Sequence, residues 1–197
     1  MTTSGSTDFN LEFVDIAEEA FERAGREMRS GYDLRTARRS MNLLTIEWAN
    51  RGINMWTIEQ GTKNLVQGTA TYDLPNDTID LLEHVIRTGA GNVSTQADLT
   101  LTRISVSTYA TIPNKLSQAR PIQIYVQRNS GQTYPATSAY SPGATAYPSF
   151  TVWPVPDQGT EASPYYQVVY WRMRRVQDAG DGLQTPDMPF RFLPCIT

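Results

Sequence analysis

The chain has 197 residues, of which 40% are hydrophobic, and its formal net charge is −3. A chain of this length suits one ordinary domain with or without an extension and buries roughly 70% of its unfolded surface, so a core can form without disulfides. The acidic balance argues against general DNA binding, because that affinity comes from neutralising phosphates. Cys195 is the only cysteine, which excludes an intramolecular disulfide and a thiolate metal cluster.

The first residues, 1–9, are predicted to form a flexible arm. They lack the basic and apolar regions of a signal peptide. No apolar run along the chain approaches the roughly 20 residues that a membrane span requires, so no membrane contact is expected.

Residues 10–52 are predicted to form an antiparallel helical hairpin. A first helix is expected from about Asn10 to Arg29, capped by Asp8 or Asn10, and a second from an N-cap at Asp33 to about Asn50. Apolar residues recur at three- and four-residue steps in both: Phe13, Ala17, Ala20, Phe21, Ala24 and Met28, then Leu34, Ala37, Met41, Leu44 and Trp48. Because the connection at Ser30 and Gly31 is short, the helices should pack against each other.

Three arginines, Arg35, Arg38 and Arg39, lie off the apolar stripe of the second helix and near one another. Two interpretations stay open. They can form a solvated helix face, or they can contact an acidic neighbouring subunit, since arginine favours bidentate pairing with carboxylates.

Residues 53–178 are predicted to form a β-rich domain of the sandwich or barrel-like kind. Gly61, Gly68 and Pro75 are expected in turns, and residues 105–110 in a single helical turn. Strands are expected at residues 54–60, 63–67, 69–74, 81–88, 99–104, 122–128, 150–154 and 165–174. With the helical hairpin, these strands predict an α+β fold.

Two features of this domain are candidates for contacts with other proteins. The long loop 129–148 contains Tyr134, Tyr140 and Tyr147, and arginines Arg172 and Arg174 alternate with large side chains in the last strand. The aromatic residues of this half suit a sandwich core or a subunit interface. A sugar-binding or base-stacking surface is the alternative.

Residues 179–197 are predicted to be a linker and the start of a C-terminal element. Phe190, Phe192 and Leu193 bring new apolar surface that nothing earlier in the chain is expected to cover. We expect that this segment either continues into a further helix or packs on a partner. Phe190 and Phe192 are therefore candidate interface residues.

No catalytic, metal or cofactor site is predicted. His84 is the only histidine and is expected in a strand, where packing is commoner than general-base catalysis. The acidic residues of the first helix are explained by pairs such as Glu19–Arg23 and Glu22–Arg26 rather than by a glycosidase site. Asp73, Asp77 and Asp80 lack the glycine and glutamate of a calcium loop, and turn capping accounts for them better.

Residues 31–87 resemble the head-to-tail adaptors of tailed bacteriophages, notably the tail accessory factor or tail tubular proteins of short-tailed phages. The resemblance rests on ARRSMNLL at 37–44, WANRGINMWT at 48–57 and GTATYDLPNDTIDLL at 68–82. Looser matches follow in YATIPNK at 109–115, WPVPD at 153–157 and YWRMRRVQD at 170–178.

This resemblance implies a structural protein of the virion neck or tail, assembled in the host cytoplasm. It implies a ring of about twelve copies beneath the portal protein, above further tail or nozzle proteins, through which double-stranded DNA passes without sequence recognition. It also implies a further C-terminal helix that docks on the portal. Two alternatives remain: a carbohydrate- or receptor-binding tail module that uses the tyrosine-rich loop, and a cell-wall hydrolase that uses Glu18, Glu19 or Glu22.

Overall fold

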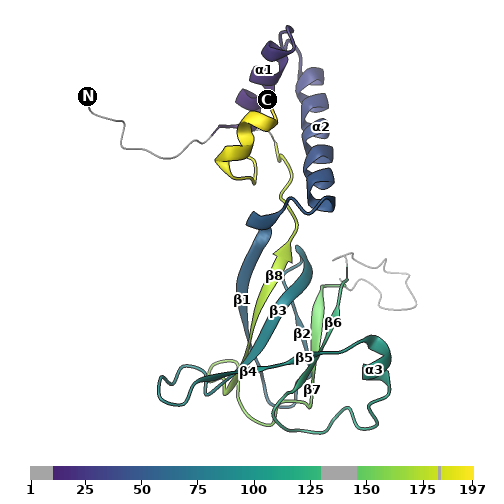
Figure 1. The fold of residues 1–197 in the computed structure, drawn as a ribbon, viewed down its shortest axis with the longest axis vertical. Coiled ribbons are helices and arrows are strands. Elements are labelled where there is room, and N and C mark those ends of the chain that lie inside the picture. The colour runs from purple at the N-terminus through teal and green to yellow at the C-terminus, as the bar shows by residue number, and fades with distance from the viewer. Residues whose placement is uncertain (1–10, 130–145, 182) are drawn as a thin grey trace. The chain divides into compact units, whose positions relative to one another are not determined.

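A computed structural model describes residues 11–129, 146–181 and 183–197 of the chain. The chain forms two compact units: Met1–Thr57 with Val176–Thr197, and Ile58–Arg175. The first unit contains the long helices and the second contains both sheets (Figure 1). The predicted α+β class, with N-terminal helices followed by a β-rich domain, is confirmed.

The first helix of the first unit, α1 (Phe13–Arg23), is shorter than predicted. It begins after Glu12, whose backbone N–H donates to the Asp15 carboxylate three residues on, and so it needs neither predicted cap. The predicted caps, Asp8 and Asn10, lie outside the described residues. The helix ends six residues early because Gly25 has a φ of 69°, a left-handed conformation that interrupts the helical path.

The second helix, α2 (Gly31–Asn50), begins earlier than predicted, because Ser30 and not Asp33 is its N-cap. The Asp33 backbone N–H donates to Ser30 Oγ, and the Ser30 backbone N–H donates in turn to the Asp33 carboxylate. The hydrogen bond with the Ser30 hydroxyl is the main reason why the pKa of Asp33 lies below 3.8. At the other end, Gly52 has a φ of 79°, as expected of a residue that stops a helix.

The core of this unit combines the hairpin with the C-terminal segment. Phe13, Ala17 and Met41 are buried together with Ala179, and Leu34, Ala37 and Met188 pack against them. Asn42 Oδ1 accepts a hydrogen bond from the Ala179 backbone, which fixes the C-terminal segment to α2.

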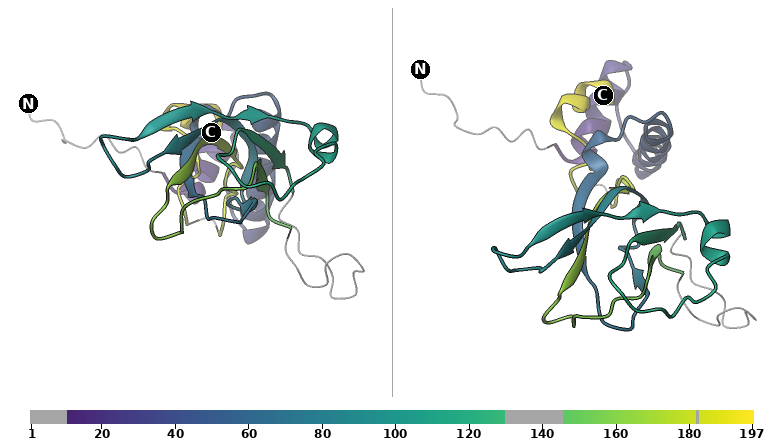
Figure 2. Two further views of the ribbon diagram at one scale, coloured as in Figure 1. Left: turned by 90° about the horizontal axis from the view of Figure 1, so that it is seen from below. Right: turned by 60° about the horizontal axis from the view of Figure 1, so that its bottom comes forward.

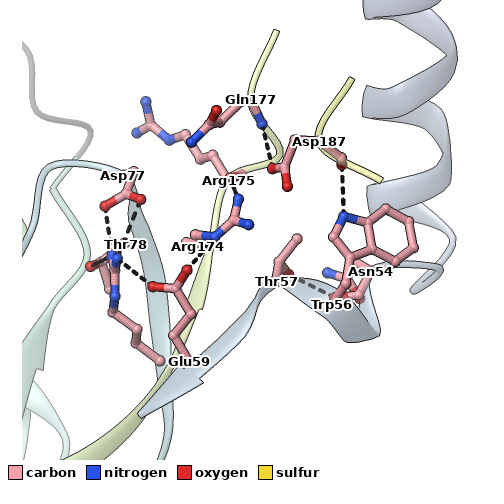
Figure 3. A network of polar contacts seen from close by, with 11 residues as sticks. Asn54, Trp56, Thr57, Glu59, Asp77, Thr78, Arg174, Arg175, Gln177 and Asp187 are labelled. Atoms are coloured by element: carbon pink, nitrogen blue, oxygen red, sulfur yellow. Dashed lines mark hydrogen bonds and ion pairs between the residues drawn. The ribbon is translucent and has the colours of Figure 1, made fainter. Parts of the chain in front are cut away.

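The last element of the chain is the 3-10 helix η2 (Phe190–Cys195). The expectation that Phe192 and Leu193 are uncovered is wrong. Leu193 is buried, and the Phe192 ring lies 5.6 Å from the Trp48 ring and 5.2 Å from the Trp56 ring. Trp56 belongs to the short 3-10 helix η1 (Met55–Thr57), and its indole N–H donates to the Asp187 carbonyl (Figure 3). Phe190 remains exposed, as predicted.

The second unit consists of two four-stranded sheets, which Figure 2 shows from two further directions. One sheet has the order β1-β8-β3-β4: β1 (Ile58–Asn64), β8 (Tyr166–Arg174), β3 (Thr78–Thr88) and β4 (Ala97–Thr100). The other has the order β2-β7-β6-β5: β2 (Thr71–Asp73), β7 (Ser149–Trp153), β6 (Gln123–Gln127) and β5 (Thr102–Arg103). Neighbouring strands are antiparallel except for β5 and β6. The helical turn α3 (Val106–Ala110) lies where it was predicted.

Both sheets contribute side chains to one core. Ile86 and Val168 come from the first sheet, and Ile124 and Phe150 from the second. Fully buried aliphatic side chains on paired strands explain why the β-branched runs of the sequence were recognisable as strands.

Gly61 was predicted to lie in a turn, and this prediction is wrong. It lies in the middle of β1, opposite Tyr170 of β8. A Cβ atom at this position would lie 2.6 Å from the Tyr170 ring, so the glycine makes room for an aromatic side chain. Gly68, with a φ of 78°, is a turn residue as predicted.

Candidate assembly surfaces

The outer face of α2 carries an exposed stripe, which we call the α2 ridge. It lies opposite the buried Met41, and its members follow one another at steps of three and four residues. The ridge consists of Tyr32, Arg35, Arg39, Leu43 and Ile46. Four of these five residues also line a shallow hollow of about 350 Å³.

The three arginines predicted as interface residues therefore divide into two groups. Arg35 and Arg39 are exposed on the α2 ridge, and neither forms an ion pair with any residue that the structure describes. Arg38 is half-buried, and its guanidinium donates to the Gly180 carbonyl at 2.9 Å. Arg38 thus holds the C-terminal segment, while the contact of the other two with a neighbouring subunit stays a prediction.

The outer face of α1 is acidic, and we call it the α1 acidic face. Asp15, Glu18 and Glu22 are exposed at steps of three and four residues, opposite the buried Phe13 and Ala17. The predicted Glu19–Arg23 ion pair is present at 2.7 Å. The predicted Glu22–Arg26 pair is absent among the described ion pairs, because Arg26 lies beyond the end of the helix.

A groove of about 540 Å³ lies between α1 and α2. Ile16, Phe21, Leu44 and Ile196 are among the apolar side chains that line it. The hairpin is therefore not closed along this side.

In the second unit, the predicted interface residues Arg172 and Arg174 bind carboxylates of the same chain. Arg172 donates to Glu59 at 2.8 Å, to Asp77 at 2.5 Å and to the Thr78 hydroxyl at 2.9 Å. Arg174 donates to the other oxygen of Glu59 at 2.6 Å, and Figure 3 shows this carboxylate directed toward it. Only 11% and 12% of the two arginine side chains are exposed.

This network joins β1 and β8 to the start of β3. Burial by itself would raise the pKa of Asp77, but the hydrogen bonds and charge of Arg172 outweigh it and hold this pKa below 3.8. Glu59 was not among the predicted interface residues. The antiparallel register that sets Glu59 opposite Arg172 could not be read from composition. A role of these arginines toward another subunit stays a prediction.

A second ion cluster surrounds Asp80. Its carboxylate accepts from Arg103 at 2.7 Å and from Arg128 at 2.6 Å, and it also accepts from the backbone N–H of Leu81. Burial by itself would raise the pKa of Asp80. The hydrogen bonds with the two arginines outweigh this effect, so the pKa of Asp80 is lowered. The Asp80 carboxylate, for which calcium binding had been considered, is therefore paired with two arginines. The described residues contain no group of three or more side chains that could hold a metal ion.

Several aromatic residues of the β-rich unit serve its core. Tyr166 and Tyr170 are buried in the common core, and the Tyr72 and Phe150 rings stack at 5.4 Å. Tyr147 is exposed. Tyr134 and Tyr140 lie outside the described residues, so sugar or receptor binding by this loop stays a prediction.

His84 lies in β3 opposite Tyr170. Both of its ring nitrogens are buried and have no hydrogen-bond partner among the described residues. Burial, followed by the nearby charge of Arg103, lowers its pKa below 6.5.

Among the helices of the described ranges, none is both long and apolar enough to cross a bilayer. The first unit presents two exposed faces of different chemistry, and ion pairs internal to the chain link the strands of the second. The two exposed faces of the first unit are candidate surfaces for contacts with other proteins.

The comparison with protein families identifies the family of the chain. The family described as SU10 adaptor protein, a family of phage head-to-tail adaptors, matches residues 14–196, and the chain belongs to this family. The resemblance to head-to-tail adaptors is thereby confirmed, over a range that includes both units. A search among curated proteins finds no match. The family is a structural one rather than a class of enzymes, and it belongs to the neck of the virion.

Proposed function

We propose that this chain is the subunit of a ring that lies beneath the phage portal, extends the DNA channel and joins the capsid to the tail. The observation that carries the proposal is the family match, which covers 183 positions from residue 14 to residue 196. The partners are further copies of the chain, about twelve in all, the portal protein above and tail or nozzle proteins below. Assembly takes place in the host cytoplasm.

The surfaces of the first unit support this role. A closed ring is built from heterologous contacts, in which two different faces of each subunit meet. The α2 ridge and the α1 acidic face are two such faces, with opposite charge. The groove of about 540 Å³ between the helices offers a third, apolar surface for another protein.

The overall charge of −3 agrees with a passage for DNA. A channel that released its DNA quickly would avoid many phosphate contacts, because each contact adds affinity and slows transit. The ion pairs of Arg172, Arg174 and Arg103 also agree with a passage for DNA, because arginines that are paired with carboxylates of the chain are less available to bind phosphates.

The test is to purify the full chain together with the portal protein of the same phage and to record averaged electron-microscope images and native mass spectra. We expect a ring of cyclic symmetry stacked on the portal, with the portal alone and the chain alone as controls. A chain that stays monomeric and does not bind the portal at any salt concentration would overturn the proposal. Glycan binding by such a monomer, lost on substitution of Tyr147, would favour the receptor-binding alternative.

A further inference from the structure

The charges left unpaired on the hairpin are divided between its two helices. Most arginines of the described chain bind a carboxylate of the same chain, as Arg23, Arg87 and Arg172 do. Among the described residues, Arg35 and Arg39 on the α2 ridge form no ion pair, and neither do Glu18 and Glu22 on the α1 acidic face. The two faces point away from the shared core of the hairpin, so they cannot meet within one chain.

We propose that the α2 ridge of one copy docks antiparallel on the α1 acidic face of a second copy. The inference rests on the proposed ring and names the faces through which neighbouring subunits meet. The occupant of the ridge is a second copy of this chain, because the same chain supplies a face of opposite charge and of matching spacing.

The spacing of the charges supports this contact. Arg35 and Arg39 are four residues apart, as are Glu18 and Glu22, so both pairs are separated by about 6 Å along their helices. Two guanidinium groups can therefore face two carboxylates at the same time. Like charges in this position would repel and exclude wrong registers.

The apolar residues of the ridge fit the same register. An antiparallel docking that sets Arg39 against Glu18 determines every other facing pair. Two further pairs follow on α1, namely Arg35 with Glu22 and Leu43 with Val14, while Ile46 comes next to Leu11, which precedes the helix. Leu43 and Ile46 are 62% and 57% exposed, Leu11 is 40% exposed and Val14 is half-buried. The contact would thus cover large apolar side chains next to the two charge pairs.

The parallel alternative fits less well. With Arg39 against Glu22, Leu43 would face position 26, an arginine beyond the end of α1, and its apolar surface would stay uncovered. Both registers set the two arginines against the two glutamates, but only the antiparallel one also sets an apolar side chain of α1, Val14, against Leu43.

The contact is heterologous, since the ridge and the acidic face are different surfaces on opposite sides of one hairpin. Each copy uses both, one toward each neighbour, and a chain of such contacts closes into a ring when the rotation between copies allows it. The contact should weaken with added salt, because its charge pairs are at a solvent-accessible surface.

Two full-length double variants test the proposal. The first carries Arg35→Glu and Arg39→Glu, so that both of its faces are acidic. The second carries Glu18→Arg and Glu22→Arg, so that both are basic. Each variant alone should assemble at concentrations at least about tenfold higher than the wild type, because like charges meet in every contact.

An equimolar mixture should restore assembly. The acidic ridge of the first variant then faces the basic α1 of the second, and the basic ridge of the second faces the acidic α1 of the first. Native mass spectrometry should find rings with equal numbers of the two variants. A matched control, Arg29→Glu with Arg51→Glu, makes the same change of charge in the same unit at side chains that are 79% and 69% exposed. It should assemble as the wild type does, within about twofold.

The outcomes separate this inference from the proposed ring. A wild type that forms no ring even with the portal overturns both. Rings that form equally well from the wild type and from each double variant, with unchanged circular dichroism, overturn the inference and leave the ring intact. Variants that assemble alone but no longer bind the portal would mean that the ridge contacts the portal, which also overturns the inference.

Discussion

The replacement of Gly61 by alanine tests the packing of the β-rich unit most directly. Gly61 lies in the middle of β1, and a Cβ atom there would lie 2.6 Å from Cε2 and Cζ of Tyr170 and 2.7 Å from its hydroxyl oxygen. Contacts below 3 Å between such atoms require the ring to move. Tyr170 is only 5% exposed and belongs to the core between the sheets, so it has little room to do so.

The expected cost combines two opposite effects. Inserting a methyl group into a filled core destabilises a protein by about 1–3 kcal/mol. Gly61 does not have a positive φ, so alanine is compatible with its backbone and would otherwise stabilise the chain by about 0.4–1 kcal/mol through the unfolded state. We therefore expect Gly61→Ala to lower the free energy of unfolding by about 1–2 kcal/mol.

Urea unfolding, followed by tryptophan fluorescence and circular dichroism, measures this change, and the shift should fall on the transition of residues 58–175. Gly31→Ala is the control, since nothing lies within 4 Å of its added Cβ at the start of α2. It should be neutral or stabilising. In a Tyr170→Val background, the sign at position 61 should reverse, because the obstructing ring is gone. Equal stability of Gly61→Ala and the wild type would refute the packing argument.

Three further predictions concern polar groups. Arg172→Met should lower the free energy of unfolding at pH 7 by about 1–3 kcal/mol in urea titrations. This loss is smaller than for a fully buried ion pair, because the Glu59 and Asp77 side chains are 42% and 44% exposed. The control variant Arg51→Met should have little effect. Ser30→Ala should cost about 1 kcal/mol and lower the melting temperature of the hairpin, whereas Ser30→Asp should preserve it. Because the folded-state pKa of His84 lies below 6.5, the unfolded chain binds the proton first. The free energy of unfolding should therefore be highest above the unfolded pKa of 6.5 and should fall as the pH drops toward the folded pKa of His84. The variant His84→Gln should remove this pH dependence between pH 5 and 7. A slope in this pH range that survives the substitution would contradict the assignment, since the chain has no other histidine.

Local patterns in the sequence predicted much of the secondary structure. The apolar periodicity around Met41 identified α2, and runs of β-branched and aromatic residues identified β6 and β8. These signals depend on residues within a few positions of one another, which is why they can be read without the fold. The resemblance over residues 31–87 was equally local, and it led to the correct family.

Element ends and glycine roles were less predictable from the sequence. The first helix was expected to reach Arg29, and Gly61 was expected in a turn. In both cases a glycine had two possible uses. Gly25 interrupts a helix whose apolar pattern continues past it, while Gly61 supports an extended strand because a distant ring needs the space.

The arginines of the second helix were also predictable only in part. Helical periodicity was enough to predict that Arg35, Arg38 and Arg39 lie beside one another on a helix and off its apolar stripe. The path of the C-terminal segment, which periodicity does not give, brings the Gly180 carbonyl to Arg38 and leaves the other two arginines on the exposed ridge.

Long-range pairing accounts for what the sequence could not determine. Arg172 meets Glu59 across 113 positions, and Phe192 meets Trp48 and Trp56 across more than 130. Helical and strand periodicity determine which side of an element a residue occupies, because that depends on its near neighbours in the chain. Which other side chain it meets depends on strand register and on the path of the returning C-terminal segment, and these exist only in the folded protein.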